Sequence, residues 1–427
     1  MVVGPVTNAR SLHLQVFHMN ITRILSRVSV DLVWMPIALL TLLVPRNRRL
    51  WVFGSCSGYK YADHSRMLYE SLRDNGDYAA IRVVWSTKSD EIFHDLEGRG
   101  YPVIKANTLR GFLTTLRAGV CVYTHYAHDH NRIAAFGAYK IQLWHGIPLK
   151  RFKAVSGLLD KGFAGRGYRG LHNWMLEVQR VMFPWANPTW DLLVFQSDVD
   201  RERTGAAFKG TYRQGLVAGS IRGENLRQQF SLGRMDSDKR TRRILYAPTH
   251  RALGRESLFA KVPVPEGEVL HGRLRGMGAT LDVRLHPCQE KEPVPEALNS
   301  GPARLVGNGS GDDIYRDLHC YDLLITDYSS IFIDVLPLEM PIVFLAPDHL
   351  DYSAEDQGFF SDKFSVPGPV AMTWEEALDY CDSLLNEGVD PWGDARKEAS
   401  VFYFKGSSIK GSPMEKVLST VKEKLEI

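Results

Sequence analysis

From residue 50 onward, short apolar runs alternate with stretches whose apolar residues recur at helical spacing. The runs expected to be strands lie at 50–55, 81–86, 102–106, 120–125, 140–145, 192–197, 215–220, 243–250, 281–287, 322–327 and 341–346. Helices are expected at 64–74 and 108–119, and the clearest amphipathic helices at 371–386 and 412–426. Alternation of strands and helices predicts an α/β protein whose parallel sheets carry helices on both faces.

The chain has 427 residues, which is more than one domain usually holds. We therefore expect two facing Rossmann-like domains. The first spans residues 50–210, and the second spans residues 211–427 and ends in a closing C-terminal helix. Ligands of such sheets bind beyond the carboxyl ends of the strands, which predicts a site in the cleft between the two domains.

Residues 1–49 form a segment of different character. Residues 32–44 carry no charge, whereas Arg46, Arg48 and Arg49 follow directly. A helix needs about 20 apolar residues to span a bilayer, so this run is too short. It predicts a short membrane-interface segment whose arginines contact anionic head groups. A buried core helix of the first domain is the alternative.

Charge and cysteine content narrow the class of protein. The net charge is +3, which is too small to indicate a nucleic-acid partner. The five cysteines are far apart and show no metal-binding spacing. They predict reduced thiols in a cytoplasmic protein, and we expect neither a metal nor a cofactor.

Polar residues stand where several of these strands end. His145 closes the run 140–145 and is followed by Gly146, which permits close backbone approach, and by Lys150. Imidazole suits proton transfer near neutral pH. A histidine that hydrogen-bonds its own loop is the simpler alternative, and the same choice applies to His286 at the end of another strand.

Two further strand ends offer groups that bind anions. Thr249 and His250 end the run 243–250 and Arg251 follows it, and Arg222 stands just after the run 215–220. Hydroxyl, imidazole and guanidinium groups together are typical of phosphate sites. Several polar strand ends in one chain predict a site for an anionic substrate, with histidines that move protons.

The segment Asp327-Tyr328-Ser329-Ser330 joins a buried strand to a short helix. Ser329 or Ser330 could cap the helix, whose first N–H groups would then bind a phosphate. The charge of Asp327 is wrong for that role, so we expect it to order the loop or bind a hydroxyl. A plain strand-to-helix cap is the alternative. The acidic residues at 198–200 and 312–313 are expected at helix starts rather than at a metal.

Five motifs together resemble one known family. They are WHGIPLK, YAPTHR, RLHP, DLLITDYSSIFID and GFFSDKFSVPGP, which fall in order between residues 50 and 405. This pattern is similar to that of the CDP-glycerol glycerophosphotransferases, the teichoic-acid primases and polymerases. The resemblance implies a glycosyltransferase-B-like fold, with an acceptor domain followed by a CDP-donor domain.

The same resemblance implies a reaction and its partners. A polyol phosphate, most readily glycerol phosphate, would pass from a CDP-activated donor to a hydroxyl of a lipid-linked glycan acceptor and release CMP. This would occur in teichoic-acid or capsule-type polymer synthesis, on a peripheral enzyme at the cytoplasmic face of the cell membrane.

Roles for individual residues follow from their place in the motifs. His145 would be the base, and His286 would stabilise charge on the departing CMP. The segment from Asp327 to Ser330 would bind the donor phosphates, Arg222 would be a second phosphate ligand, and Ser55 would touch a substrate. Two other functions stay open at this point: a glycosyltransferase that uses a nucleotide sugar, and a non-catalytic protein that binds the membrane surface.

Overall fold

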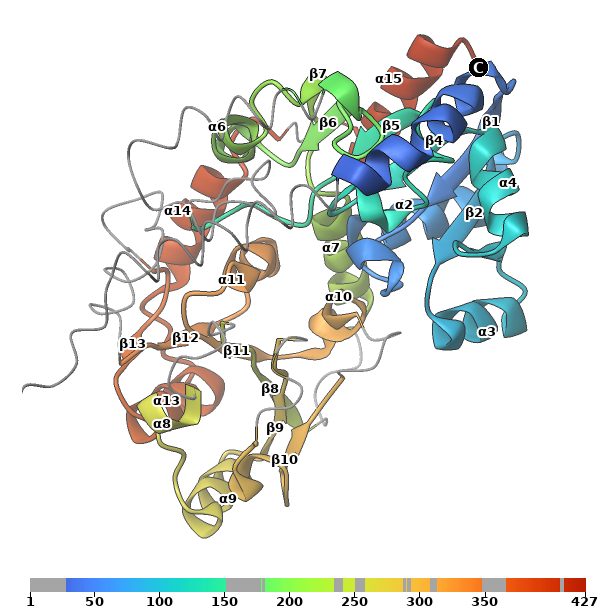
Figure 1. Cartoon of the computed structure of the whole chain (residues 1–427). Helices are drawn as coiled ribbons and strands as arrows, with labels where there is room; N and C mark the ends of the chain where they lie inside the picture. The colour runs from blue at the N-terminus through green and yellow to red at the C-terminus, as the bar shows by residue number, and fades with distance from the viewer. Residues whose placement is uncertain are drawn as a thin grey trace, which may run out of the picture.

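The structure is a computed structural model of the whole chain, shown in Figure 1 as two α/β lobes. It describes residues 28–150, 178, 181–233, 241–249, 258–286, 289, 293–307, 313–347, 366–407 and 411–427. The lobe at the upper right holds β1 to β7, and the lower lobe holds β8 to β13. Two parallel sheets, as predicted, therefore organise the chain.

The first sheet has seven strands in the order β3-β2-β1-β4-β5-β6-β7, and every paired neighbour is parallel. The strands are β1 Asn47–Phe53, β2 Arg82–Thr87, β3 Val103–Lys105, β4 Ala118–Tyr123, β5 Tyr139–Gln142, β6 Trp190–Phe195 and β7 Tyr212–Val217. The order reverses between β1 and β4, and ligands of doubly wound folds bind at such a reversal.

The second sheet repeats this plan with six parallel strands in the order β10-β9-β8-β11-β12-β13. They are β8 Arg242–Tyr246, β9 Ala279–Val283, β10 Ala303–Leu305, β11 Leu323–Thr326, β12 Ile342–Leu345 and β13 Val370–Ala371. Its reversal lies between β8 and β11, which places the ends of these two strands at the second ligand-binding edge.

Helices connect the strands and cover the sheets. They are α2 Asp63–Asp74, α3 Asp90–Gly98, α4 Leu109–Arg117, α6 Asp198–Ala207, α7 Ile221–Gly233, α8 Leu258–Lys261, α9 Gly267–Gly276, α10 Ile314–Asp317, α11 Ile331–Val335, α13 Trp374–Asp382, α14 Gly393–Tyr403 and α15 Pro413–Leu425. Ser89, Thr108 and Thr373 cap the first turns of α3, α4 and α13 through their side-chain oxygens, as helix N-termini require.

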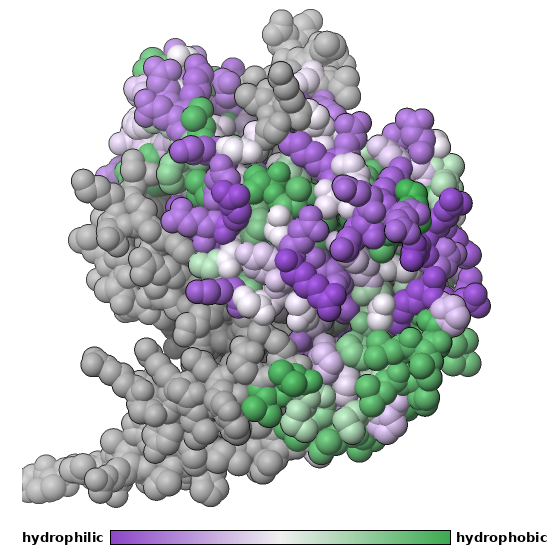
Figure 2. Space-filling view, turned by 90° about the horizontal axis from the view of Figure 1, so that it is seen from above, coloured by the Kyte–Doolittle hydropathy of each residue, from purple (hydrophilic) through white to green (hydrophobic). Residues whose placement is uncertain are grey.

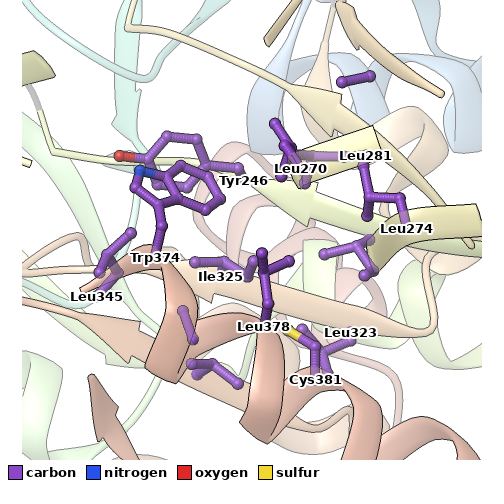
Figure 3. Packing of buried hydrophobic residues seen from close by; sticks show 14 of the residues in the cluster. Tyr246, Leu270, Leu274, Leu281, Leu323, Ile325, Leu345, Trp374, Leu378 and Cys381 are labelled. Carbon is purple, nitrogen blue, oxygen red and sulfur yellow. The ribbon is translucent and has the colours of Figure 1, made fainter. Parts of the chain in front are cut away.

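Both faces of each sheet are buried. Along β12, Ile342 and Phe344 pack into one apolar cluster, whereas Val343 and Leu345 pack into another on the opposite face. Successive side chains of a strand point to opposite faces, so two covered faces need a continuous apolar run rather than an alternating one. Figure 3 shows how Trp374 of α13 packs against Tyr246 of β8 in one of these clusters.

The boundary expected between residues 210 and 211 is wrong. The strand β7 lies beyond it, yet β7 pairs with β6 in the first sheet. The closing helix α15 also returns to the first lobe, where Val417, Leu418 and Val421 join the apolar cluster around Trp51. The sequence around residue 215 reads as a strand, but only its pairing partner assigns it to a sheet.

The N-terminal segment that the structure describes is helical over residues 28–40 and continues as a 3-10 turn, Thr41–Leu43. Among the described residues, no helix is long and apolar enough to cross a membrane. One side of this segment is buried, since Ala38 packs with Ile133, Phe183 and Trp185. Its other side leaves large apolar residues exposed, and Figure 2 shows hydrophobic residues gathered along one edge of the molecule.

Arg46 does not lie where the sequence predicted. Its guanidinium donates to the backbone oxygens of Ala118 and Ala134 at 3.2 and 3.1 Å, which ties the segment to the first lobe. Arg48 is exposed and donates to the backbone oxygen of Leu425 at 2.8 Å. Arg46 therefore attaches the N-terminal segment to the first lobe, whereas Arg48, in β1, contacts the end of α15.

Candidate active site

His145 stands on a sharp corner after β5. The backbone N–H of Trp144 donates to the side-chain oxygen of Gln142 at 2.9 Å, and Trp144 has a φ of 55°. Gly146 has a φ of 145°, where only glycine is unstrained, and a Cβ there would lie 3.2 Å from Nη2 of Arg222. The glycine therefore does permit a close approach, and the group that approaches is Arg222.

The imidazole of His145 is oriented as a base requires. Its Nδ1 lies 3.2 Å from the backbone oxygen of Thr124, which can only accept a hydrogen bond. Nδ1 therefore carries the hydrogen, and Nε2 keeps its lone pair. Burial, then the neighbouring His125, lower the pKa of His145 to about 3, against an opposing effect of Asp63. His145 is thus neutral at physiological pH, and it remains half-buried rather than sealed off.

The carboxyl ends of β1 and β4 form the wall behind His145. Asp129 is buried, and its carboxylate accepts hydrogen bonds from the backbone N–H groups of Ser57, Thr124 and His125 at 2.6, 2.9 and 2.9 Å. This carboxylate joins the loop after β1 to the loop after β4. The joined loops hold the ring of His125 against that of His145, with 4.4 Å between the ring centroids.

Arg222 is fully buried at the junction of the two lobes. Its Nη1 donates to Asp63 at 2.8 Å and to the backbone oxygen of His145 at 3.2 Å, while Nη2 donates to Asp334 at 2.6 Å. The guanidinium also lies 3.6 Å from the ring centroid of Tyr315. Because both terminal nitrogens bind carboxylates, this geometry does not favour the predicted phosphate contact, which stays a prediction.

A second ion pair reinforces the same junction. Arg66 of α2 donates to Asp313 at 3.0 Å, and Asp313 also accepts the backbone N–H of Asp63 at 3.0 Å. Asp313 caps α10 through the N–H of Tyr315, as expected of an acid at a helix start. Asp200 likewise lies in the first turn of α6. The two lobes are therefore held together by charge pairs directly beneath the His145 corner.

The second lobe contributes the ends of β8 and β11. The carboxylate of Asp327 is buried and accepts the backbone N–H of Thr249 at 2.7 Å. This contact gives Asp327 the loop-ordering part of its expected roles. The hydroxyl of Thr249 is buried and has no partner among the described residues, so a phosphate oxygen could bind it.

The sequence predicted that either Ser329 or Ser330 caps α11, and the structure separates the two serines. Ser329 Oγ lies 3.4 Å from the backbone nitrogen of Ile331, whereas Ser330 is the N-cap residue and makes no side-chain cap. The hydroxyl of Ser330 is therefore not used to cap α11. Phosphate binding by this corner stays a prediction.

The other predicted site residues have mixed outcomes. His286 is exposed beyond β9, and Lys150 is half-buried after the His145 corner. His250 and Arg251 lie outside the described residues. Ser55 is fully buried, and its hydroxyl bonds Thr124 and Cys56, so it supports the site from behind. Across the described ranges, no group of three or more His, Cys, Asp or Glu residues is arranged to hold a metal ion.

This arrangement matches one protein family along most of the chain. Residues 37–405 fit the model of the CDP-glycerol:poly(glycerophosphate) glycerophosphotransferase family. The chain belongs to this family, which confirms the resemblance seen in its motifs.

Curated relatives carry teichoic-acid names. The chain is 26% identical to the teichoic acid poly(glycerol phosphate) polymerase of Bacillus subtilis (strain 168) over 79% of its own length and 44% of that protein's. It is 24% identical to the teichoic acid glycerol-phosphate transferase of Staphylococcus aureus (strain NCTC 8325 / PS 47) over 88% of its length and 93% of that protein's. The chain thus spans less than half of the first relative and nearly all of the second.

The fold has a solved counterpart in the wall teichoic acid polymerase TagF. That structure matches with a TM-score of 0.66 at 19% identity, over 97% of this chain and 98% of the other. At this identity the match supports the fold, namely two parallel α/β sheets in one chain.

Sequence reasoning missed three residues around His145. His125 ends the predicted strand 120–125, and its ring stacks on His145. Asp63 pairs with Arg222, and Asp129 fixes the loops behind the site. His125 showed the signal used for His145, a histidine at a strand end. Asp63 showed none, because Arg222 is distant in the sequence, and Asp129 showed none, because it stands in the loop after β4 rather than at the strand end.

Proposed function

We propose that this protein transfers glycerol phosphate from CDP-glycerol to a hydroxyl of a lipid-linked glycan acceptor and releases CMP, in the synthesis of a teichoic-acid-type polymer. The observation that carries the proposal is the orientation of His145. Its Nε2 keeps a lone pair at the corner after β5, next to the buried Arg222 at the junction of the two lobes, in a chain of the CDP-glycerol glycerophosphotransferase family.

In the proposed reaction, the acceptor oxygen attacks the phosphorus that carries glycerol. The new P–O bond forms as the bond to CMP breaks, and the acceptor's proton goes to Nε2 of His145. Donor phosphates bound near the imidazole would raise its pKa from about 3, because an opposite charge favours the protonated form. The base would thus gain strength when the substrate is in place.

The donor would lie against the second lobe. Thr249 and the segment from Asp327 to Ser330 would face its phosphates, and His286 would neutralise charge on the departing CMP. We propose that His250 and Arg251 add to this side and that no metal is needed. The overall arrangement would then be glycosyltransferase-B-like, with the acceptor on the first lobe and the donor on the second.

The donor can be identified by incubating the protein with CDP-glycerol, CDP-ribitol or a UDP-sugar, each with a lipid-linked glycan acceptor. We expect acceptor-dependent CMP release from CDP-glycerol, with slower or no release from CDP-ribitol. Turnover of the UDP-sugar alone would support a glycosyltransferase. Binding of CDP-glycerol without any CMP release would support a non-catalytic protein.

We further propose that the protein is peripheral at the cytoplasmic face of the membrane and binds an anionic surface. The N-terminal helix and α4 pack together through Met35, Ala38 and Phe112, in a cluster that also holds Phe183. Around this cluster, the N-terminal segment, α4 and the stretch at 181–182 expose a set of large apolar residues: Val30, Leu32, Val33, Trp34, Ile37, Leu39, Leu40, Leu42, Leu43, Leu109, Leu113, Val181 and Met182. The surface is wider than the N-terminal segment alone, which suits a protein that lies on a bilayer.

Charged substitutions on this surface should release the protein from membranes. Val33 and Leu43 are 73% and 78% exposed, so replacing both with glutamate should not disturb the core. We expect V33E/L43E to bind phosphatidylglycerol-containing vesicles about tenfold or more weakly in a sedimentation assay, since each apolar side chain loses its transfer free energy. Val401 on α14 is 74% exposed, and V401E is the matched control. Equal weakening in both variants, or in neither, would contradict this surface.

A further inference from the structure

Four polar side chains behind His145 close a ring of hydrogen bonds. Thr124 Oγ1 donates to Ser55 Oγ at 2.9 Å, and Ser55 Oγ donates to Cys56 Sγ at 3.4 Å. Cys56 Sγ lies 3.7 Å from Nε2 of His125, and Nδ1 of His125 lies 3.0 Å from Thr124 Oγ1. The ring thus returns to its starting atom through the two nitrogens of one imidazole.

Such a ring accommodates a neutral imidazole and excludes a charged one. Traversed in either direction, each group donates once and accepts once, and His125 carries a single N–H. A second proton on His125 would make the ring nitrogens donors on both sides. One hydrogen near Ser55 would then lack an acceptor. Because Ser55 is fully buried, water cannot replace that acceptor, and an unsatisfied buried donor costs free energy.

The ionisation of the ring members agrees with this geometry. Burial raises the pKa of the Cys56 thiol to about 12, so the thiol keeps the hydrogen that the ring requires. Burial also lowers the pKa of His125 to about 4. The ring of hydrogen bonds is therefore complete over the whole pH range in which an enzyme of this kind would work.

His125 is in direct contact with the proposed base. Its ring lies parallel to that of His145, with an interplanar angle of 17°. It covers one face of that ring from water and repels a proton on it. Among the residues that the structure describes, the other charged or titratable groups that act on His145 are Asp63, which favours the protonated form, and Arg222 and His64, which disfavour it.

We propose that His125 is a positioning residue that keeps His145 unprotonated and fixed, with Nε2 ready to accept the acceptor's proton, and that the ring of Ser55, Cys56 and Thr124 keeps His125 itself neutral. This proposal rests on the proposed role of His145 as the base. It assigns a function to Cys56 and Thr124, which do not bind substrate in this account.

Histidine NMR tests the first half of the proposal without any turnover. In the wild-type protein labelled at histidine Cε1, neither His125 nor His145 should titrate above pH 5. In His125→Asn, which removes the stacked ring and admits water, the pKa of His145 should rise by about one unit or more. His125→Phe is the matched variant, because it keeps the stacked cover, and the pKa of His145 should stay closer to that of the wild type.

A cysteine pair tests the ring. Cys56→Ala removes the group that pairs with Nε2 of His125, so the pKa of His125 should rise by about one unit. Cys56→Ser keeps an O–H at that position and should keep the pKa of His125 near its wild-type value. If both variants behave alike, the ring does not set the charge of His125, and that half of the proposal is wrong.

Kinetics separates positioning from packing. The acid limb of kcat/KM should move to higher pH in His125→Asn by about the same one unit, with turnover at pH 8 close to that of the wild type. A loss of turnover at every pH, with the pKa of His145 unchanged, would mean that His125 serves packing alone and would overturn the proposal. Wild-type protein that never releases CMP from CDP-glycerol would defeat the proposed function instead, while leaving the NMR titrations interpretable.

Discussion

Replacing His145 with glutamine should lower kcat for CMP release by about a thousandfold, the usual contribution of a positioned general base. Glutamine can still donate to the backbone oxygen of Thr124, so the corner after β5 should keep its shape. It cannot take the acceptor's proton. The chemical step should therefore suffer, while the KM for CDP-glycerol should change little, because in the proposed arrangement the other lobe binds the donor.

A matched histidine controls for the loss of an imidazole as such. His94 on α3 has an exposed side chain, and its Nδ1 lies 3.8 Å from a carboxylate oxygen of Glu97 on the surface. His94→Gln should keep full turnover. If His145→Gln unfolds at the same temperature as the wild type and still releases CMP at an undiminished rate, His145 is not the base.

Replacing Arg222 with methionine should lower the free energy of unfolding by about 3–5 kcal/mol. Methionine fills much of the same volume, but it leaves Asp63 and Asp334 buried without their cation. The backbone oxygen of His145 also loses its donor. We therefore expect a fall in kcat together with the loss of stability, measured by chemical denaturation and by CMP release.

An exposed arginine provides the comparison. Arg48 pairs with Glu426 at 3.5 Å, with 57% and 84% of the two side chains exposed, and such pairs contribute little to stability. Arg48→Met should shift the free energy of unfolding by less than about 1 kcal/mol. If Arg222→Met were as stable as Arg48→Met, the two lobes would not depend on the buried pairs, and Arg222 would be free for the phosphate role predicted from its motif.

The strands were predictable because both faces of each sheet are covered. The run 341–346 reads as uniformly apolar since Ile342 and Val343 point into different clusters, and β12 Ile342–Leu345 lies within the predicted limits. Pairing was not predictable from the same runs. Nothing local in β7 distinguishes the edge of the first sheet from the start of the second, and α15 gave no sign that it packs on the other lobe.

The site residues were predictable where a polar side chain stands directly at the end of a predicted strand. His145 and Asp327 are such cases: Asp327 follows β11 at the reversal of the second sheet, and His145 follows β5, which lies next to β4 at the reversal of the first. Arg222 was found by its motif, but its environment was not, since Asp63 and Asp334 are far from it in the sequence. A charged side chain at a strand end can bind a ligand or pair with another charge between two lobes. The sequence does not show which residues surround it, so it does not distinguish the two roles.

The N-terminal segment shows the same limit. Its apolar run predicted a surface helix, and its exposed apolar side fits that expectation. The arginines after it suggested head-group contacts, yet Arg46 binds backbone oxygens of the first lobe. Positive charge beside an apolar run therefore identified the segment without identifying what each arginine does.

Phosphorus NMR of the reaction products tests the central proposal most directly. The protein would be incubated with CDP-glycerol and a lipid-linked glycan acceptor, and the product would be compared with the CMP formed. We expect one new phosphodiester for each CMP released, and formation of both products about a thousandfold slower with His145→Gln. CMP accompanied by free glycerol phosphate, or a glycosidic product without a new phosphodiester, would contradict the proposed transfer.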